Sequence, residues 1–131
     1  MKRTLITGAS GGLGYELAKL YAKDNNDLIL VARNEEKLNK VKEEITTTYN
    51  VKCDIVVADL TKRCDWEKVY NYTVEKNYFI NNLVNNAGFG DRTDFYQMDI
   101  NTQIDMTEVN CNSVLYFTRM FLDKMSLVEV I

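Results

Sequence analysis

The stretch TGASGGLG at residues 7–14 joins a short apolar run to an amphipathic segment. Residues 3–7 (RTLIT) predict a strand, and residues 12–23 predict a helix because their apolar side chains recur at helical spacing. The same alternation continues along the rest of the chain. Further strands are expected at residues 28–32, 51–58 and 82–86, and further helices at residues 35–49, 64–77 and 102–124.

Short apolar strands that alternate with helices predict an α/β fold. We expect a doubly wound parallel sheet, Rossmann-like, of about four strands with helices on both faces. Residues 1–131 are expected to form a single, incomplete domain in which the C-terminal part of the sheet is missing. The strand at 82–86 would then be an edge with unpaired backbone groups. The tail at 125–131 (MSLVEVI) is either a short further strand that covers this edge or an exposed end.

Polar side chains mark the starts of two helices. Asn34 is expected to cap the helix at 35–49, since an Asn side chain can accept a hydrogen bond from a free helix amide. Thr102 and Asp105 have the spacing of a capping box, which predicts that the last helix starts at Thr102.

The composition excludes several classes of protein. Of 131 residues, 46% are hydrophobic and 27% are charged, which excludes a disordered chain. No apolar run approaches the roughly 18 residues of a membrane span, and no apolar stretch after Lys2 and Arg3 suggests a secretory signal. The formal net charge of −3 without a basic run argues against a nucleic-acid partner.

Two further counts limit the chemistry. The chain has no histidine, so a Ser-His or Cys-His mechanism is excluded. Its three cysteines, Cys53, Cys64 and Cys111, are widely spaced and form no CxxC pair. The sequence therefore predicts no metal site and no redox motif, and unpaired cysteines favour a reducing cytoplasm.

The glycine spacing GxxxGxG favours a phosphate ligand at the first turn. Gly8 permits a tight turn, Gly12 lets the backbone approach a phosphate, and Gly14 lets the helix pack on the sheet. Free amides at the helix start favour a pyrophosphate. The spacing differs from GxGxxG, and no Lys-Ser or Lys-Thr follows Gly14, so the turn is not a Walker loop. The alternative is a plain tight turn without a ligand.

Arg33 at the end of the second strand indicates which dinucleotide would bind. It follows Gly14 by 19 residues, near the place where an acidic residue would bind a ribose hydroxyl and select NAD. A guanidinium can instead pair with a 2′-phosphate through two hydrogen bonds. The sequence thus predicts NADP(H) over NAD(H). The alternative is an exposed arginine that pairs with Glu35 or Glu36.

Small and polar residues also follow the third and fourth strands. Asp59 comes after the third strand, and residues 85–88 (NNAG) come after the fourth. Carboxyl ends of parallel strands meet at one edge of the sheet, where ligands of open α/β sheets bind. We therefore expect these residues to lie beside the glycine turn.

Together TGASGGLG, Asp59-Leu60, NNAG and Asn110 in EVNCNSV resemble the short-chain dehydrogenase/reductase family over residues 3–125. The resemblance implies an NADP(H)-dependent oxidoreductase that acts on a small-molecule carbonyl or alcohol substrate. Asn110 matches the active-site Asn, which in the family holds a water in a proton relay. The implied cofactor-binding residues are Gly8, Ser10, Gly11, Gly12, Leu13, Gly14, Arg33, Asp59, Leu60, Asn86, Ala87 and Gly88.

The sequence departs from the family in its catalytic part. The family's catalytic Ser and Tyr-xxx-Lys follow the fifth strand, beyond the matched region, so the resemblance implies a truncated chain that is inactive alone. The alternative is a non-catalytic nucleotide-binding or interaction module. Two other Tyr-xxx-Lys matches, which begin at Tyr15 and Tyr72, are expected to be structural, and so is Ser113. The helix at 102–124, which in the family helps to form a subunit interface, favours a homo-oligomer or self-association.

Overall fold

The structure, a computed structural model, describes residues 2–123, 125 and 129–130. Five strands form its sheet: β1 (Arg3–Thr7), β2 (Asp27–Ala32), β3 (Cys53–Val57), β4 (Asn82–Val84) and β5 (Glu129–Val130). The helices are α1 (Gly12–Lys23), α2 (Glu35–Thr48), α3 (Arg63–Glu75), α4 (Ile100–Thr107), the π-helical turn η1 (Glu108–Asn112) and α5 (Ser113–Leu122).

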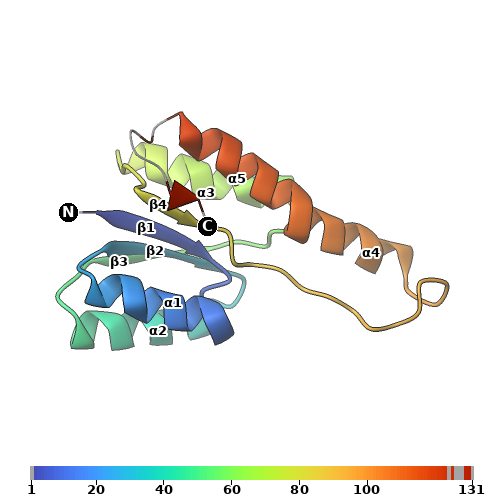
Figure 1. Cartoon of the computed structure of the whole chain (residues 1–131), viewed down its shortest axis with the longest axis horizontal. Coiled ribbons are helices and arrows are strands. Elements are labelled where there is room, and N and C mark those ends of the chain that lie inside the picture. Colours follow the sequence, from blue (N-terminus) through green and yellow to red (C-terminus); the bar gives the residue numbers. More distant parts are fainter. Residues whose placement is uncertain (1, 124, 126–128, 131) are drawn as a thin grey trace.

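The sheet is parallel and has the strand order β3-β2-β1-β4-β5. Figure 1 shows α1 and α2 on one side of it and α3 and α5 on the other, with α4 extending away from the sheet. This confirms the predicted doubly wound α/β fold. The strand order reverses beside β1, because β2 lies on one side of it and β4 on the other. Ligands of such sheets bind at this reversal, outside the carboxyl ends of the strands.

The sequence of β2 explains why this strand lies inside the sheet. All six of its residues are buried, as expected for an apolar run covered on both faces. Leu28 and Leu30 pack in the core cluster of α1 and α2, whereas Ile29 and Val31 pack in the cluster of α3 and α5. The alternation follows from the two-residue period of a strand.

The tail adds one strand to the predicted four. Val130 pairs with Leu83 in β4. The prediction that β4 is an open edge is therefore wrong. Of the two alternatives for the tail, the short strand that covers this edge is confirmed at residues 129–130. Residues 126–128 and 131 lie outside the described part of the chain. The free backbone groups of β4 account for the pairing.

The last helical segment differs from its predicted form. It starts at Ile100, because the side chain of Asp99 caps it by accepting a hydrogen bond from the amide of Asn101, and Thr102 is not the cap. The π-helical turn η1 then separates α4 from α5. The cap at Asn34 is confirmed, since its side chain accepts from the amide of Lys37 at 3.0 Å. None of the described helices is long and apolar enough to cross a membrane.

The three cysteines differ in burial, which predicts their reactivity. Cys53 is buried, whereas Cys64 and Cys111 are exposed. Burial raises the pKa of the Cys53 thiol to about 12, so the thiol stays protonated and unreactive at neutral pH. We expect a thiol reagent to label two of the three cysteines in the folded protein at mildly alkaline pH, and all three after denaturation.

The same burial gives this thiol a pH-dependent effect on stability. Since folding favours the protonated form of Cys53, its contribution to stability is complete below the ordinary thiol pKa and is lost as the pH rises toward 12. Chemical denaturation at a series of alkaline pH values would measure this fall in the free energy of unfolding.

The labelling experiment also tests the burial of Cys53. If a thiol reagent labelled all three cysteines of the folded protein at one rate, Cys53 would not be buried.

Candidate functional site

The turn between β1 and α1 brings the glycine motif against the segment that follows β4. Gly8 has a φ of +65° and Gly12 a φ of +55°, in the left-handed region that favours glycine. A Cβ built on Gly8 would lie 2.9 Å from the Cα of Ala87. Any side chain at position 8 would therefore force the two segments apart.

Gly14 is the residue through which α1 packs on this turn. A Cβ built on Gly14 would overlap the carbonyl oxygen of Gly8 and would lie 2.7 Å from Nδ2 of Asn86. Neither neighbour can move freely, since one is backbone and the other is hydrogen-bonded. The close packing expected of Gly14 is therefore present.

Thr7 and Asn86 hold the ends of β1 and β4 together. Thr7 Oγ1 accepts hydrogen bonds from the amides of Asn86 and Ala87, at 3.0 and 2.9 Å. Asn86 Nδ2 donates to the carbonyl oxygens of Thr7 and Gly8, at 3.2 Å each. The role of Thr7 could not be predicted from the sequence, because its partner Asn86 lies 79 residues away in the chain.

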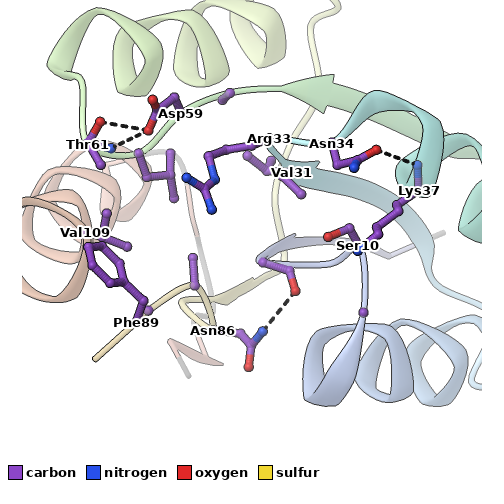
Figure 2. Close-up of a pocket in the computed structure, with 17 residues that line it drawn as sticks. Ser10, Val31, Arg33, Asn34, Lys37, Asp59, Thr61, Asn86, Phe89 and Val109 are labelled. Carbon is purple, nitrogen blue, oxygen red and sulfur yellow. Dashed lines mark hydrogen bonds between the residues drawn. The ribbon is translucent and has the colours of Figure 1, made fainter. Parts of the chain in front are cut away.

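A cleft of about 480 Å³ opens beside these segments, at the carboxyl ends of the strands (Figure 2). The expected cofactor residues that line it are Gly8, Ser10, Gly11, Arg33, Asp59, Leu60, Asn86, Ala87 and Gly88. Gly12, Leu13, Gly14 and Asn110 do not line it. The side chain of Leu13 is exposed on α1, and Gly14 is buried beneath the turn. The structure thus joins residues from four strand ends into one concave surface.

Asp59 presents a carboxylate to this cleft. Its Oδ1 accepts from the amide of Thr61 at 3.0 Å and from the Thr61 hydroxyl at 2.8 Å. Burial raises the pKa of the Asp59 carboxyl, but these two hydrogen bonds lower it. The charges of Arg33 and Lys62 lower it further, so that the pKa lies below its usual value. Asp59 is therefore ionised at neutral pH, and its Oδ2 can accept a further donor.

Two cationic side chains reach the cleft, Arg33 from the loop after β2 and Lys37 from the first turn of α2. Figure 2 shows the guanidinium of Arg33 directed into the cleft and the side chain of Lys37 extending toward Ser10. Among the described residues, neither cation has an ion-pair partner within 4.0 Å. The alternative in which Arg33 pairs with a neighbouring glutamate is therefore not found; Glu36 pairs with Lys40 instead, at 3.8 Å.

Lys37 was not predicted from the sequence as a residue of the cleft. Arg33 precedes the N-cap Asn34 and lies outside α2, so no helical spacing relates it to Lys37. The available signal was the place of Lys37 on the first turn of the helix that follows β2, close to the carboxyl edge of the sheet.

Asn110 lies in η1 and clamps the chain that follows β4. Its Oδ1 accepts from the amide of Phe89 at 3.0 Å, and its Nδ2 donates to the carbonyl oxygen of Phe89 at 2.8 Å. A Cβ on Gly88 would lie 2.9 Å from Asn110 Oδ1. Since Phe89 lines the cleft, Asn110 positions one wall of it. The proton-relay role of Asn110 stays a prediction.

Asn110→Asp is expected to loosen this wall. A carboxylate cannot donate to the carbonyl oxygen of Phe89, and it would place two acceptors in contact. We expect the free energy of unfolding to fall by about 1–3 kcal/mol, and trypsin to cut faster after Arg92 in the adjoining loop. Asn71→Asp, at an exposed position on α3, is the matched control. Equal cleavage rates in the two variants would show that the clamp does not order the loop.

The Tyr-xxx-Lys matches and Ser113 lie outside the lining of the cleft. The hydroxyls of Tyr15 and Tyr72 donate to the carboxylates of Glu44 and Asp54, at 2.6 Å in each case. The hydrogen bond to Glu44 raises the pKa of Tyr15, and burial together with Asp54 raises the pKa of Tyr72. A tyrosine that exchanges protons near neutral pH needs the opposite shift. Ser113 is buried, and its hydroxyl donates to a carbonyl oxygen one helical turn earlier.

Comparisons with known proteins agree with this geometry. A sequence profile of the short chain dehydrogenase family matches residues 2–129. A very-long-chain 3-oxoacyl-CoA reductase of Anas platyrhynchos is 35% identical over 125 residues, which cover 92% of this chain and 40% of the relative. An 11-beta-hydroxysteroid dehydrogenase A of Sesamum indicum is 34% identical over 119 residues, which cover 90% of this chain and 34% of the relative. The chain thus spans less than half of the length of these curated relatives.

A solved structure shares the fold. The alcohol dehydrogenase of the archaeon Thermococcus sibiricus, complexed with 5-hydroxy-NADP, matches with a TM-score of 0.89 and 30% sequence identity. The match covers 95% of this chain and 53% of that chain. Nearly the whole sequence therefore matches both the family profile and the fold of a solved oxidoreductase, and the chain belongs to the short-chain dehydrogenase family.

Proposed function

We propose that this chain binds NADP(H) in the cleft, as the dinucleotide-binding part of a short-chain oxidoreductase. The observation that carries the proposal is Arg33, whose guanidinium points into the cleft and has no ion-pair partner among the described residues. A guanidinium can hold a ribose 2′-phosphate through two parallel hydrogen bonds. The NADP derivative in the relative from Thermococcus sibiricus supports the same cofactor class.

The remaining surface of the cleft fits the other parts of a dinucleotide. The glycine turn offers backbone amides and the N-terminus of α1 to a diphosphate. Asp59 offers an acceptor to the amino group of an adenine, and the side chain of Leu60 offers an apolar surface to its ring. Residues 86–88 would pack against the adenosine ribose. The cleft has the volume typical of small-molecule sites.

The reaction we propose for the complete enzyme is hydride transfer to or from a carbonyl or alcohol substrate. The bound cofactor supplies the hydride, and the protein has to position the substrate and manage its proton. The chain alone is proposed to bind cofactor without efficient turnover. In support, the two Tyr-xxx-Lys tyrosines carry raised pKa values and do not line the cleft. Loss of a general acid typically lowers a rate by about 10²–10⁴-fold.

A paired binding and turnover experiment tests this proposal. NADPH fluorescence would be titrated with the purified chain, and NADPH oxidation would then be followed with a panel of ketones and aldehydes. We expect saturable binding, with rates at the uncatalysed background. Turnover that disappears in Tyr15→Phe or Tyr72→Phe would contradict the proposed inactivity. The chain could also be fused to the C-terminal half of a related short-chain dehydrogenase. If this fusion bound NADPH but still showed no turnover, the result would favour a non-catalytic module.

We also propose that the chain self-associates in the cytoplasm. The described α4 buries none of its side chains, and Ile100 and Ile104 are 61% and 49% exposed. Leu115 on α5 is 70% exposed. Apolar side chains that recur along one segment favour contact with another protein surface. Sedimentation velocity over a range of concentrations should detect species larger than a monomer, and a monomer at every concentration would contradict this proposal.

A further inference from the structure

Lys37 is a cation in the cleft to which neither the resemblance nor the comparisons give a role. It lies on the first turn of α2, lines the cleft, and extends toward Ser10 (Figure 2). Two other helical lysines pair with carboxylates, Lys19 with Glu16 at 3.2 Å and Lys40 with Glu36 at 3.8 Å. Lys37 is the lysine among the residues that line the cleft. Among the described residues Lys37 has no such partner.

The backbone of Lys37 is held by the cap of α2, while its side chain is exposed at the cleft. Asn34 Oδ1 accepts a hydrogen bond from the backbone amide of Lys37 at 3.0 Å, which fixes the first turn of α2. Lys37 and Arg33 are four residues apart, and both side chains line the same cleft. The lining also includes the carboxylate of Asp59, whose charge interacts with that of Arg33. Two cations and one carboxylate leave a net positive charge in the cleft, which an anion bound between Arg33 and Lys37 would neutralise.

We propose that Lys37 is a second specificity-determining residue for the ribose 2′-phosphate, with Arg33 and the hydroxyl of Ser10 as the other ligands. This inference rests on the proposed binding of NADP(H). A phosphate monoester carries a charge of roughly −1.5 to −2 at neutral pH, so one guanidinium does not neutralise it. Arg33 supplies a planar pair of donors, and the Lys37 ammonium supplies a compact charge on a flexible stem. Ser10 lies in the glycine turn, so the same phosphate would link this turn to α2.

If Arg33 and Lys37 both bind the 2′-phosphate, loss of Lys37 should lower the preference for NADPH over NADH. Lys37→Gln removes one charge and one donor, and should weaken NADPH binding by about tenfold, the low end for a hydrogen bond to a charged group. NADH lacks the 2′-phosphate, so its dissociation constant should change by less than about twofold by the same reasoning. Raising the salt concentration should weaken NADPH binding less in Lys37→Gln than in wild type, because one fewer charge contact is screened.

Calorimetric titration of wild type, Lys37→Gln and Lys40→Gln with NADPH and with NADH tests the inference. Lys40→Gln is the matched control, because Lys40 is exposed on the same helix, pairs with Glu36 and does not line the cleft. It removes the same charge, so a general electrostatic effect would appear in both variants. We expect only Lys37→Gln to weaken NADPH binding, and its NADH binding to stay at the wild-type value.

The outcomes separate this inference from the proposed function. If wild type prefers NADPH and Arg33→Gln abolishes the preference, but Lys37→Gln binds NADPH as wild type does, the role of Lys37 is refuted while cofactor binding stands. An equal loss in Lys40→Gln would also refute it. If wild type binds neither dinucleotide, both the proposed function and this inference fail. Circular dichroism of each variant would verify that it is folded.

Discussion

Gly14→Ala should lower the free energy of unfolding by about 1–3 kcal/mol and abolish NADPH binding. On an exposed helix the same change would stabilise the protein, because alanine has the better helix propensity by roughly 1 kcal/mol. At Gly14 the added methyl would overlap the carbonyl oxygen of Gly8 and lie 2.7 Å from Asn86 Nδ2. To relieve this overlap, the start of α1 and the glycine turn must move apart, which distorts the proposed diphosphate site.

Urea denaturation and NADPH titration of Gly14→Ala measure both effects. Gly90→Ala is the control, because a Cβ there meets nothing within 4 Å and the backbone is not left-handed. Its free energy of unfolding should stay within about 0.5 kcal/mol of wild type. A Gly14→Ala protein that is as stable as wild type and binds NADPH equally well would show that the turn is not tightly packed.

Arg33→Gln should weaken NADPH binding by roughly 10–100-fold and leave NADH binding nearly unchanged. The reason is that the proposed bidentate contact is made only to the 2′-phosphate. Arg33→Lys should recover part of the loss, since an ammonium keeps the charge but not the paired donors.

Arg119→Gln is the matched control for Arg33→Gln. Arg119 pairs with Asp123 on the surface at 2.8 Å and does not line the cleft. Calorimetry of wild type and the two variants with both dinucleotides gives the dissociation constants that are needed. If Arg33→Gln weakened NADPH and NADH binding by the same factor, Arg33 would support the cleft as a whole and would not bind the 2′-phosphate specifically.

The parts of the fold that could be predicted from the sequence are those that depend on residues close together in the chain. The apolar run of β2 fits only a strand covered on both faces, and Asn34 caps α2 where its position in the sequence indicates. The glycine turn was predictable for a related reason. Gly8 and Gly12 adopt left-handed backbone angles that other residues rarely adopt.

The parts that could not be predicted depend on contacts between distant segments. Asn110 clamps Phe89 across 21 residues of chain, and this pairing exists only once η1 lies beside the end of β4. The tail was ambiguous because a short apolar segment can pair with an edge or remain exposed, and the free edge of β4 decides in favour of pairing at residues 129–130. The capping-box spacing of Thr102 and Asp105 favoured Thr102 as the cap, whereas Asp99, three residues earlier, caps the helix.

Amide hydrogen exchange with and without saturating NADPH tests most directly whether the cleft holds a dinucleotide diphosphate. We expect the amides of residues 8–14 and 86–88 to exchange more slowly when NADPH is present, because a bound diphosphate accepts hydrogen bonds from the first group and the ribose covers the second. Residues 100–107 in α4 should exchange at the same rate in both samples. Unchanged exchange at residues 8–14 under saturating NADPH, or protection confined to α4, would contradict the account.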